Sequence, residues 1–227
     1  MELVKTALLI CSGPSAENLA IPPEMPVACV NGSFALLKDR LPNWWCVGEL
    51  NGASHYKADF DRMFAAGVTC LTRQRCIDRC GWKGATPIGE IFGPRYLWPI
   101  HDDVLGVVPP MPPDHKRPDS VRPWCTSGVL MLWWLMHFVT PKRIIVAGMD
   151  GYGAQEYAKG IEGVPDRPER NGIWVDLQNS KIEQSVCAIS NCPDYAGTEL
   201  VFTRMPRWWN SRCNAKLIDP TPLRWRA

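Results

Sequence analysis

Short apolar runs that alternate with helix-like segments are the feature of this sequence that most restricts its fold. The first four runs are apolar nearly throughout, and they lie at Thr6–Cys11, Pro26–Val30, Asn43–Val47 and Val68–Leu71. Strands of this kind are buried on both faces, as in a parallel sheet that is covered by helices on both sides. The pattern predicts an α/β fold, a doubly wound, Rossmann-like sheet that is mostly parallel.

Further elements are expected between and after these strands. Helices are predicted at Ala16–Leu19, Phe34–Arg40 and Ser54–Ala66. The second half adds a capped apolar helix, a buried strand, a short helix and a last strand, at Val129–Val139, Ile144–Ala147, Ile182–Ile189 and Glu199–Thr203. We treat residues 1–227 as a single domain.

Two stretches interrupt this pattern. Residues 73–123 are rich in proline and glycine and show no clear period, which predicts an insertion or a set of loops across one end of the sheet. Residues 151–181 are polar and glycine-rich, and we expect them to form a lid region.

Charge and hydropathy exclude several protein classes. The net charge of +2 excludes a polybasic arm, and 46% hydrophobic residues suffice for a core. The N-terminus lacks the features of a secretory signal, so the ten cysteines are expected to be reduced. The longest apolar stretch, Gly128–Val139, is shorter than the roughly 20 residues that cross a membrane. These features predict a soluble, cytoplasmic protein without a membrane span.

Small and polar residues follow the predicted strands, where open α/β sheets bind their ligands. They lie at Ser12–Ser15, Asn31–Ser33, Gly48–Glu49 and Gly148–Asp150, and Thr126–Gly128 joins them at a helix start. Hydroxyl and amide groups at a helix N-terminus suit a phosphate, which favours a nucleotide or nucleotide-sugar as ligand. The alternative is that such strand ends are commonly small and polar, and that Thr126 and Ser127 only cap a buried helix.

Four motifs in order resemble those of a group of Rossmann-like transferases. Ile10-Cys-Ser-Gly-Pro-Ser15 resembles a G-x-G-P-S signature, and Cys29-Val-Asn31 resembles an asparagine that ends strand two. Thr126-Ser-Gly-Val129 resembles a T-S-G-V helix start, and Ile145–Tyr152, followed by Tyr157, resembles a hydrophobic-G-x-D-x-Y segment. The group includes bacterial sialyltransferases that use CMP-sialic acid, motility-accessory flagellin glycosyltransferases and 6-hydroxymethylpterin diphosphokinase-like proteins. The resemblance implies a GT-A-like variant of the Rossmann-like sheet.

The resemblance also implies roles for individual residues. Tyr152 and Tyr157 would be catalytic, donating hydrogen bonds to the departing phosphate oxygen. The other residues would bind the nucleotide: Ser12, Gly13, Ser15, Asn31, Thr126, Ser127 and Gly128, to which we add Glu49 and Asp150 at their strand ends.

This chain also departs from the sialyltransferases in its site residues. They carry an asparagine where this chain has Ser12, and another where it has Gly48-Glu49. They use a histidine after the tyrosines as general base, whereas all four histidines here precede Tyr152. The base is then missing, or is one of Asp176, Glu183, Glu49, His101 and His115.

These observations favour a glycosyltransferase that uses a nucleotide-sugar donor, with a CMP-linked sugar favoured and no metal expected. The acceptor stays open among a glycan, a protein and a modified nucleic acid, and so does assembly into a homo-oligomer. Two alternatives share the scaffold: a magnesium-dependent, pterin-type diphosphokinase that uses ATP, and a nucleotide-binding module without activity.

Other clusters favour structural roles. Cys70, Cys76 and Cys80, with His55, lack the spacing that is typical of structural zinc sites. Asp102-Asp103 and Asp114 are expected to be solvated loop charges. The arginines and tryptophans of residues 204–212 and 224–226 could stack on bases, but packing of the tryptophans on the domain is the favoured interpretation.

Overall fold

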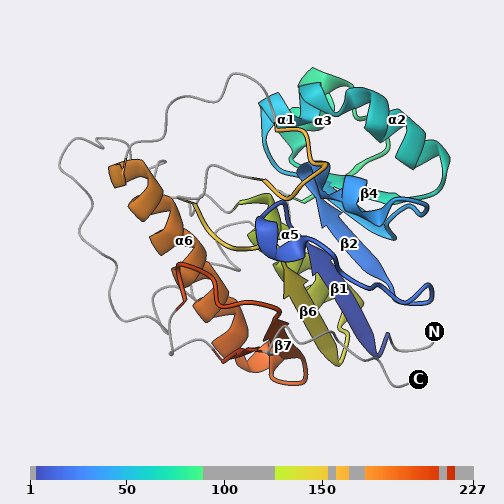
Figure 1. Ribbon diagram of the computed structural model, residues 1–227. Helices are drawn as coiled ribbons and strands as arrows, with labels where there is room; N and C mark the ends of the chain where they lie inside the picture. The colour runs from blue at the N-terminus through green and yellow to red at the C-terminus, as the bar shows by residue number, and fades with distance from the viewer. Residues whose placement is uncertain (1–3, 89–125, 153–156, 164–171, 210–213, 218–227) are drawn as a thin grey trace.

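A single parallel sheet organises the chain (Figure 1). The computed structural model describes residues 4–88, 126–152, 157–163, 172–209 and 214–217. Within them, eight strands lie in the order β5-β4-β3-β2-β1-β6-β7-β8, and every neighbouring pair is parallel. The predicted doubly wound α/β class is confirmed.

The six predicted strands are present, and their ends agree with the prediction to within about two residues. The strands are β1 Thr6–Ile10, β2 Val27–Val30, β3 Trp44–Val47, β4 Thr69–Thr72, β5 Thr86–Pro87, β6 Arg143–Ala147, β7 Glu199–Phe202 and β8 Lys216–Leu217. Side chains of β1 alternate between two buried clusters: Leu8 and Ile10 face one, and Leu9 faces the other. Because both faces are covered, these strands are apolar throughout.

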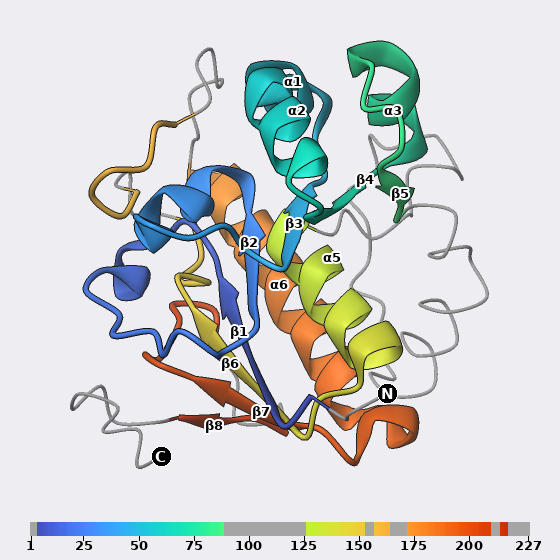
Figure 2. The same ribbon diagram turned by 90° about the vertical axis from the view of Figure 1, so that its right-hand side faces the viewer.

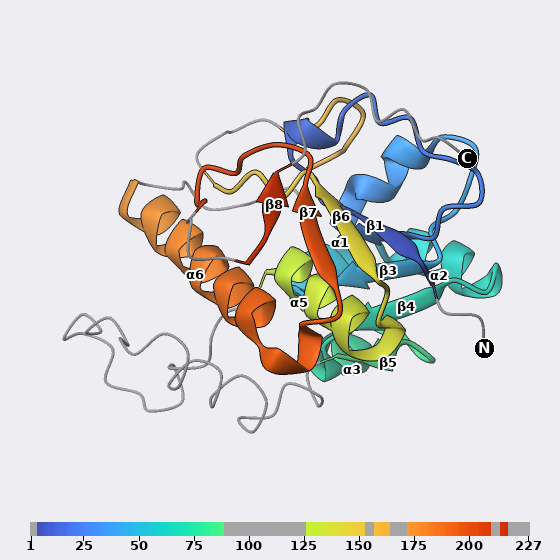
Figure 3. The same cartoon turned by 90° about the horizontal axis from the view of Figure 1, so that it is seen from below.

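One face of the sheet is covered by two long helices that lie side by side (Figure 2). Helix α5, Ser127–Trp134, is buried along its whole length and continues into a π-helical turn, η4, Leu135–Val139. Helix α6, Gly172–Asn191, and the short turn η5, Pro193–Tyr195, complete this layer. The view from below shows α5 and α6 on the same side of β6 and β7 (Figure 3).

Shorter elements cover the other face. They are η1 Pro14–Ala16, η2 Asn31–Leu37, α1 Leu50–His55, α2 Lys57–Ala65 and α3 Gln74–Cys80. The helices predicted at Ala16–Leu19 and Phe34–Arg40 are therefore wrong, because the chain forms 3-10 turns near these positions. The helix predicted at Ser54–Ala66 divides at Tyr56 into α1 and α2.

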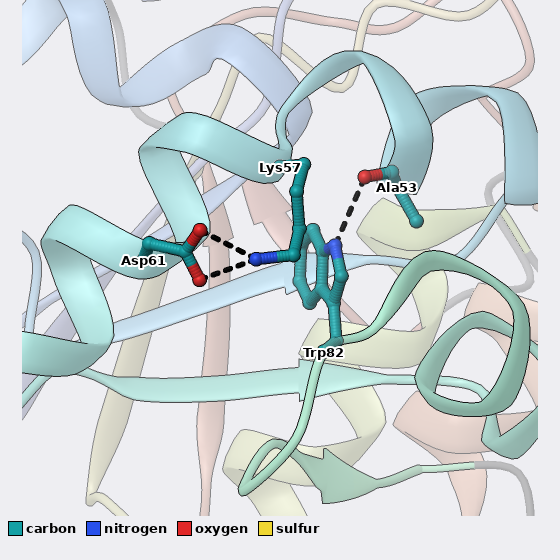
Figure 4. Close-up of polar contacts among 4 residues, drawn as sticks. All are labelled: Ala53, Lys57, Asp61 and Trp82. Carbon is teal, nitrogen blue, oxygen red and sulfur yellow. Dashed lines mark hydrogen bonds and ion pairs between the residues drawn. The ribbon is translucent and has the colours of Figure 1, made fainter.

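An aromatic stack fixes this second layer. Trp82 is fully buried between Trp45 and Phe60, with ring centroids 5.1 Å and 4.5 Å away. The indole Nε1 of Trp82 donates to the carbonyl of Ala53, at 2.9 Å, close to the exposed Lys57–Asp61 ion pair (Figure 4). The buried indole nitrogen thus has a partner, which a Trp needs inside a core.

The structure corrects the two irregular stretches in part. Helix α6 begins at Gly172, so the short helix expected at Ile182–Ile189 is the second half of a longer one, and residues 172–181 of the expected lid are helical. Helix α3 and strand β5 occupy the start of residues 73–123, and residues 89–125 lie outside the described chain.

The cysteines mostly pack as small apolar side chains. Among the described residues, seven are free thiols, and six of these are buried: Cys11, Cys29, Cys46, Cys70, Cys76 and Cys192, with Cys80 partly exposed. Cys187, on α6, is disulfide-bonded, which departs from the expectation of reduced thiols. No helix of the described chain is long and apolar enough to cross a membrane.

Candidate functional site

The cavity of interest lies at the point where the strand order reverses. The chain proceeds from β1 outward to β5, then returns to β6 on the other side of β1. Loops that follow neighbouring strands separate at such a point, and the crevice between them is where open α/β sheets bind ligands. A cavity opens there, among the carboxyl ends of β1, β2, β3 and β6 and the start of α5.

The structure brings most of the predicted site residues together around this cavity. It is lined by Ser12, Gly13, Asn31, Glu49, Thr126, Ser127, Gly128, Tyr152 and Tyr157. Ser15 and Asp150 do not line it. Sequence reasoning missed Cys11, Met149 and Ile182, because apolar residues at a strand end or on a helix carry no signal that separates a cavity wall from the core.

Ser15 and Asp150 join the two loops that flank the reversal point. The Ser15 backbone N–H donates to the Asp150 carboxylate at 2.8 Å, and the Gly148 N–H donates to the Ser15 hydroxyl at 2.9 Å. The Gly13 N–H donates to the Gly148 carbonyl, also at 2.8 Å. These bonds fix the loop after β1 against the loop after β6, so both residues support the cavity wall.

Gly13 is required by this close approach of the two loops. A Cβ at Gly13 would lie 2.6 Å from the Gly148 carbonyl oxygen and would overlap the Asp150 carboxylate. Glycine lets the backbone after β1 run directly against the backbone after β6.

Ser127 connects three of the strand ends. Its buried hydroxyl accepts from the Gly48 N–H at 2.9 Å and donates to Oδ1 of Asn31 at 3.3 Å. Asn31 has a left-handed backbone, with φ of +51°, and its carbonyl accepts from the Trp45 indole at 2.7 Å. The Ser127 hydroxyl is therefore engaged within the protein, and the backbone of α5 is the part that can face a ligand.

The start of α5 presents amide groups to the cavity. Thr126 is the N-cap, and its hydroxyl accepts from the Val129 N–H at 3.3 Å. The N–H groups of Ser127 and Gly128 have no acceptor within their own helix, because they belong to its first turn. Ser127 and Gly128 both line the cavity, and the N-terminus of a helix favours an anionic ligand.

Gly128 allows tight packing at this helix start. A Cβ there would lie 3.0 Å from the Cys11 sulfur and 3.1 Å from Cε of Met149. Burial, followed by the charge of the nearby Asp150, raises the pKa of the Cys11 thiol far above its ordinary value. Cys11 is therefore a neutral part of the cavity wall.

The two tyrosines reach the cavity from different segments. Tyr152 ends the loop that follows β6, and Tyr157 begins the described segment 157–163. The neighbouring Ala158 N–H donates to the Ser12 carbonyl at 3.0 Å, which places this segment against the loop after β1. Both tyrosine residues thus line one cavity.

Glu49 is the one charged side chain among the described residues that line the cavity. Of the other residues weighed as a general base, Asp176 and Glu183 lie on α6 and do not line it. His101 and His115 lie outside the described residues.

The remaining clusters have structural roles where they are described. Cys70 and Cys76 are core residues, and the described residues contain no group of three or more side chains suited to a metal ion. Asp102, Asp103 and Asp114 lie outside the described chain. Trp208 is 3% exposed and belongs to the core, as favoured for the tryptophans of this run, and Arg204 and Arg207 are exposed.

Comparisons with known proteins add one structural likeness. No family model matches this chain, and no curated protein matches its sequence. Among solved structures, a tyrosine-to-phenylalanine variant of the sialyltransferase CST-II in complex with CMP is similar over 85% of this chain and 72% of its own, with a TM-score of 0.42 and 12% identity. A likeness this weak carries no argument about function.

Proposed function

We propose that this chain is a glycosyltransferase that moves a sugar from a nucleotide donor, with a CMP-linked donor favoured, to an acceptor of unassigned class. One observation carries the proposal: a single cavity at the reversal point gathers residues from separate motifs of the chain. The N-terminal amides of α5 suit the donor phosphate, and Ser12 and Asn31 offer polar groups to the rest of the nucleotide.

The proposed chemistry uses the two phenols as proton donors in hydrogen bonds. As the bond between the sugar and the phosphate oxygen breaks, its electron pair stays on that oxygen, and the growing negative charge strengthens hydrogen bonds from Tyr152 and Tyr157. The acceptor hydroxyl forms the new bond to the sugar and loses its proton. We assign Glu49 as the group that takes this proton, because it is the carboxylate that lines the described cavity.

Ligand binding and turnover together test the proposal. Melting temperature is measured with CMP, UDP, GDP and ATP, each with and without magnesium, and hydrolysis or transfer of CMP-sugars is then assayed. We expect a rise with CMP that does not require magnesium, and turnover of a CMP-sugar. A rise that requires both ATP and magnesium would instead support the diphosphokinase, and binding of CMP without turnover of any CMP-sugar would support the inactive module.

The variant Glu49→Gln tests the assignment of the base. It keeps the shape of the side chain and removes its ability to take a proton, so kcat should fall about a hundredfold while CMP affinity stays within a few-fold. Glu24→Gln is the matched control, since Glu24 is exposed and does not line the cavity. An unchanged kcat in Glu49→Gln would contradict the assignment.

A further inference from the structure

We propose that Asn179, on α6, is a positioning residue for Tyr152, and that Trp208 fixes the same loop from the C-terminal segment. Neither residue lines the cavity. Both act through the loop that follows β6, at whose end Tyr152 lies. The consequence for catalysis rests on the function proposed above, whereas the positioning itself does not.

Asn179 binds both backbone groups of Tyr152. Its Oδ1 accepts from the Tyr152 N–H at 2.7 Å, and its Nδ2 donates to the Tyr152 carbonyl at 3.0 Å. One side-chain amide thus satisfies the donor and the acceptor of a single residue, as a neighbouring strand would in a sheet. This pair of bonds fixes the position of the Tyr152 backbone relative to α6.

The C-terminal segment around Trp208 supports this loop at Met149 and Asp150, which lie three and two residues before Tyr152. Its indole Nε1 donates to the Met149 carbonyl at 2.9 Å, and its ring packs edge-to-face on Phe202 of β7, with centroids 5.4 Å apart. The adjacent Arg207 N–H donates to the Asp150 carbonyl at 3.0 Å. The C-terminal segment therefore joins the loop through the carbonyls of two consecutive residues.

Gly151 shows how closely these two supports meet. Its φ is +91°, and a Cβ there would lie 2.8 Å from Oδ1 of Asn179 and 2.8 Å from Cδ1 of Trp208. The loop passes between the two side chains with no room for a third. Such close confinement leaves one backbone conformation for the residue that leads into Tyr152.

Positioning should affect reaction more than binding. Tyr152 is one of many residues that line the cavity, so a displaced phenol costs little of the affinity for a donor. A hydrogen bond that strengthens as the donor bond breaks depends on distances to within fractions of an ångström. Loss of Asn179 should therefore lower kcat and leave the KM for the donor nearly unchanged.

Fluorine NMR tests the positioning without any assay of activity. The full chain is labelled with 3-fluorotyrosine, and the resonance of Tyr152 among the five tyrosines is assigned with Tyr152→Phe. In Asn179→Ala we expect this resonance to shift or broaden. In the control Asn191→Ala it should stay unchanged, although that variant also removes a bond that a backbone N–H, that of Asn214, donates to a side-chain amide oxygen of α6.

A second variant guards against a folding defect. Trp208→Phe keeps an aromatic ring on Phe202 and removes the bond to Met149, so it should move the Tyr152 resonance in the same way but less. An unchanged Tyr152 resonance in both Asn179→Ala and Trp208→Phe overturns the positioning role.

Kinetics then test what the positioning is for. Asn179→Ala should lower kcat about tenfold in the wild-type background and have no further effect in the Tyr152→Phe background. Both changes remove the same contribution, the hydrogen bond from the Tyr152 phenol. Equal losses in the two backgrounds would overturn the claim that Asn179 acts through Tyr152. A wild-type chain that turns over no nucleotide-sugar would overturn the proposed function, and the fluorine spectra would still decide the positioning.

Discussion

The two segments that carry the tyrosines are supported in opposite ways. The loop Gly148–Tyr152 is fixed from the interior, by Asn179 of α6 and the buried Trp208. The segment 157–163, which we call the outer segment, is held by bonds of its own backbone to the loop after β1, to Glu17 and to the buried Tyr56. Two phenols with the same proposed role thus depend on different sets of contacts.

Two glycines make this difference measurable. Gly148 and Gly160 both have a left-handed backbone, with φ of +74° and +86°. A Cβ at Gly148 would overlap the Cys11 carbonyl oxygen and lie 2.7 Å from the carbon of that group, whereas a Cβ at Gly160 would meet nothing within 4 Å. Gly148 is confined by neighbouring backbone, whereas Gly160 is confined by its own conformation alone.

The largest expected effect is on stability at Gly148. Gly148→Ala should lower the free energy of unfolding by about 3 kcal/mol. The energetic cost of alanine in a left-handed conformation adds to the cost of its overlap with the Cys11 backbone. Gly160→Ala is the matched control and should cost about 1 kcal/mol, from the φ alone. Urea unfolding followed by circular dichroism measures both, and equal losses would contradict the comparison.

The second-largest effect is expected on catalysis, when both phenol hydroxyls are removed together. Tyr152→Phe combined with Tyr157→Phe should lower kcat for the cognate donor about a hundredfold, since the loss of one such donor typically costs about 3 kcal/mol. Affinity for the donor should stay within a few-fold, because the contacts strengthen mainly as the donor bond breaks. Steady-state kinetics and calorimetry measure the two quantities.

The single variants sharpen this test. If the support of Tyr152 by Asn179 and Trp208 matters for catalysis, Tyr152→Phe should lower kcat more than Tyr157→Phe does. Full activity in the double variant would remove the role in leaving-group stabilisation, and with it the main reason to prefer glycosyl transfer.

The smallest effect is expected when the support of segment 157–163 by Tyr56 is removed. The hydroxyl of Tyr56 donates to the Glu162 carbonyl at 3.1 Å, next to Gly32, so Tyr56→Phe should loosen segment 157–163 at a cost of about 1 kcal/mol. Because this segment carries Tyr157, we expect kcat to fall a few-fold with the KM for the donor nearly unchanged, as measured by steady-state kinetics.

Tyr195→Phe is the control for that variant. Its hydroxyl lies 3.2 Å from Nδ1 of His137, away from the cavity, and burial raises the pKa of Tyr195 to about 12. A fall of kcat in Tyr195→Phe as large as that in Tyr56→Phe would show that general stability, and not the support of segment 157–163, is being measured.

The sequence predicts the sheet better than it predicts the layers around it. Strands such as β1 and β6 are evident because burial on both faces leaves only apolar residues. The turns η1 and η2 were expected to be helices, since short apolar segments between strands do not distinguish a helix from a 3-10 turn. The edge strand β5 has two residues, one of them Pro87, and no periodicity marks it.

The candidate site could be predicted in outline because residues that follow parallel strands converge at one edge of the sheet. Its supports could not be predicted. Ser15 and Asp150 belong to the motifs, yet only the structure shows that their bonds join one loop to the other. Nothing in the sequence separates Asn179 from other asparagines, because its role depends on where α6 passes the loop.

The pairing of β1 with β6 also bears on how the chain is made. Thr6–Ile10 pairs with Arg143–Ala147, so as the chain leaves the ribosome the first strand has one neighbour, β2, long before it has the other. Chains that stop short of β6 would expose an apolar strand edge, which invites pairing with other chains. The cavity lies at this seam, so a nascent chain gains its binding site only after β6 has paired with β1.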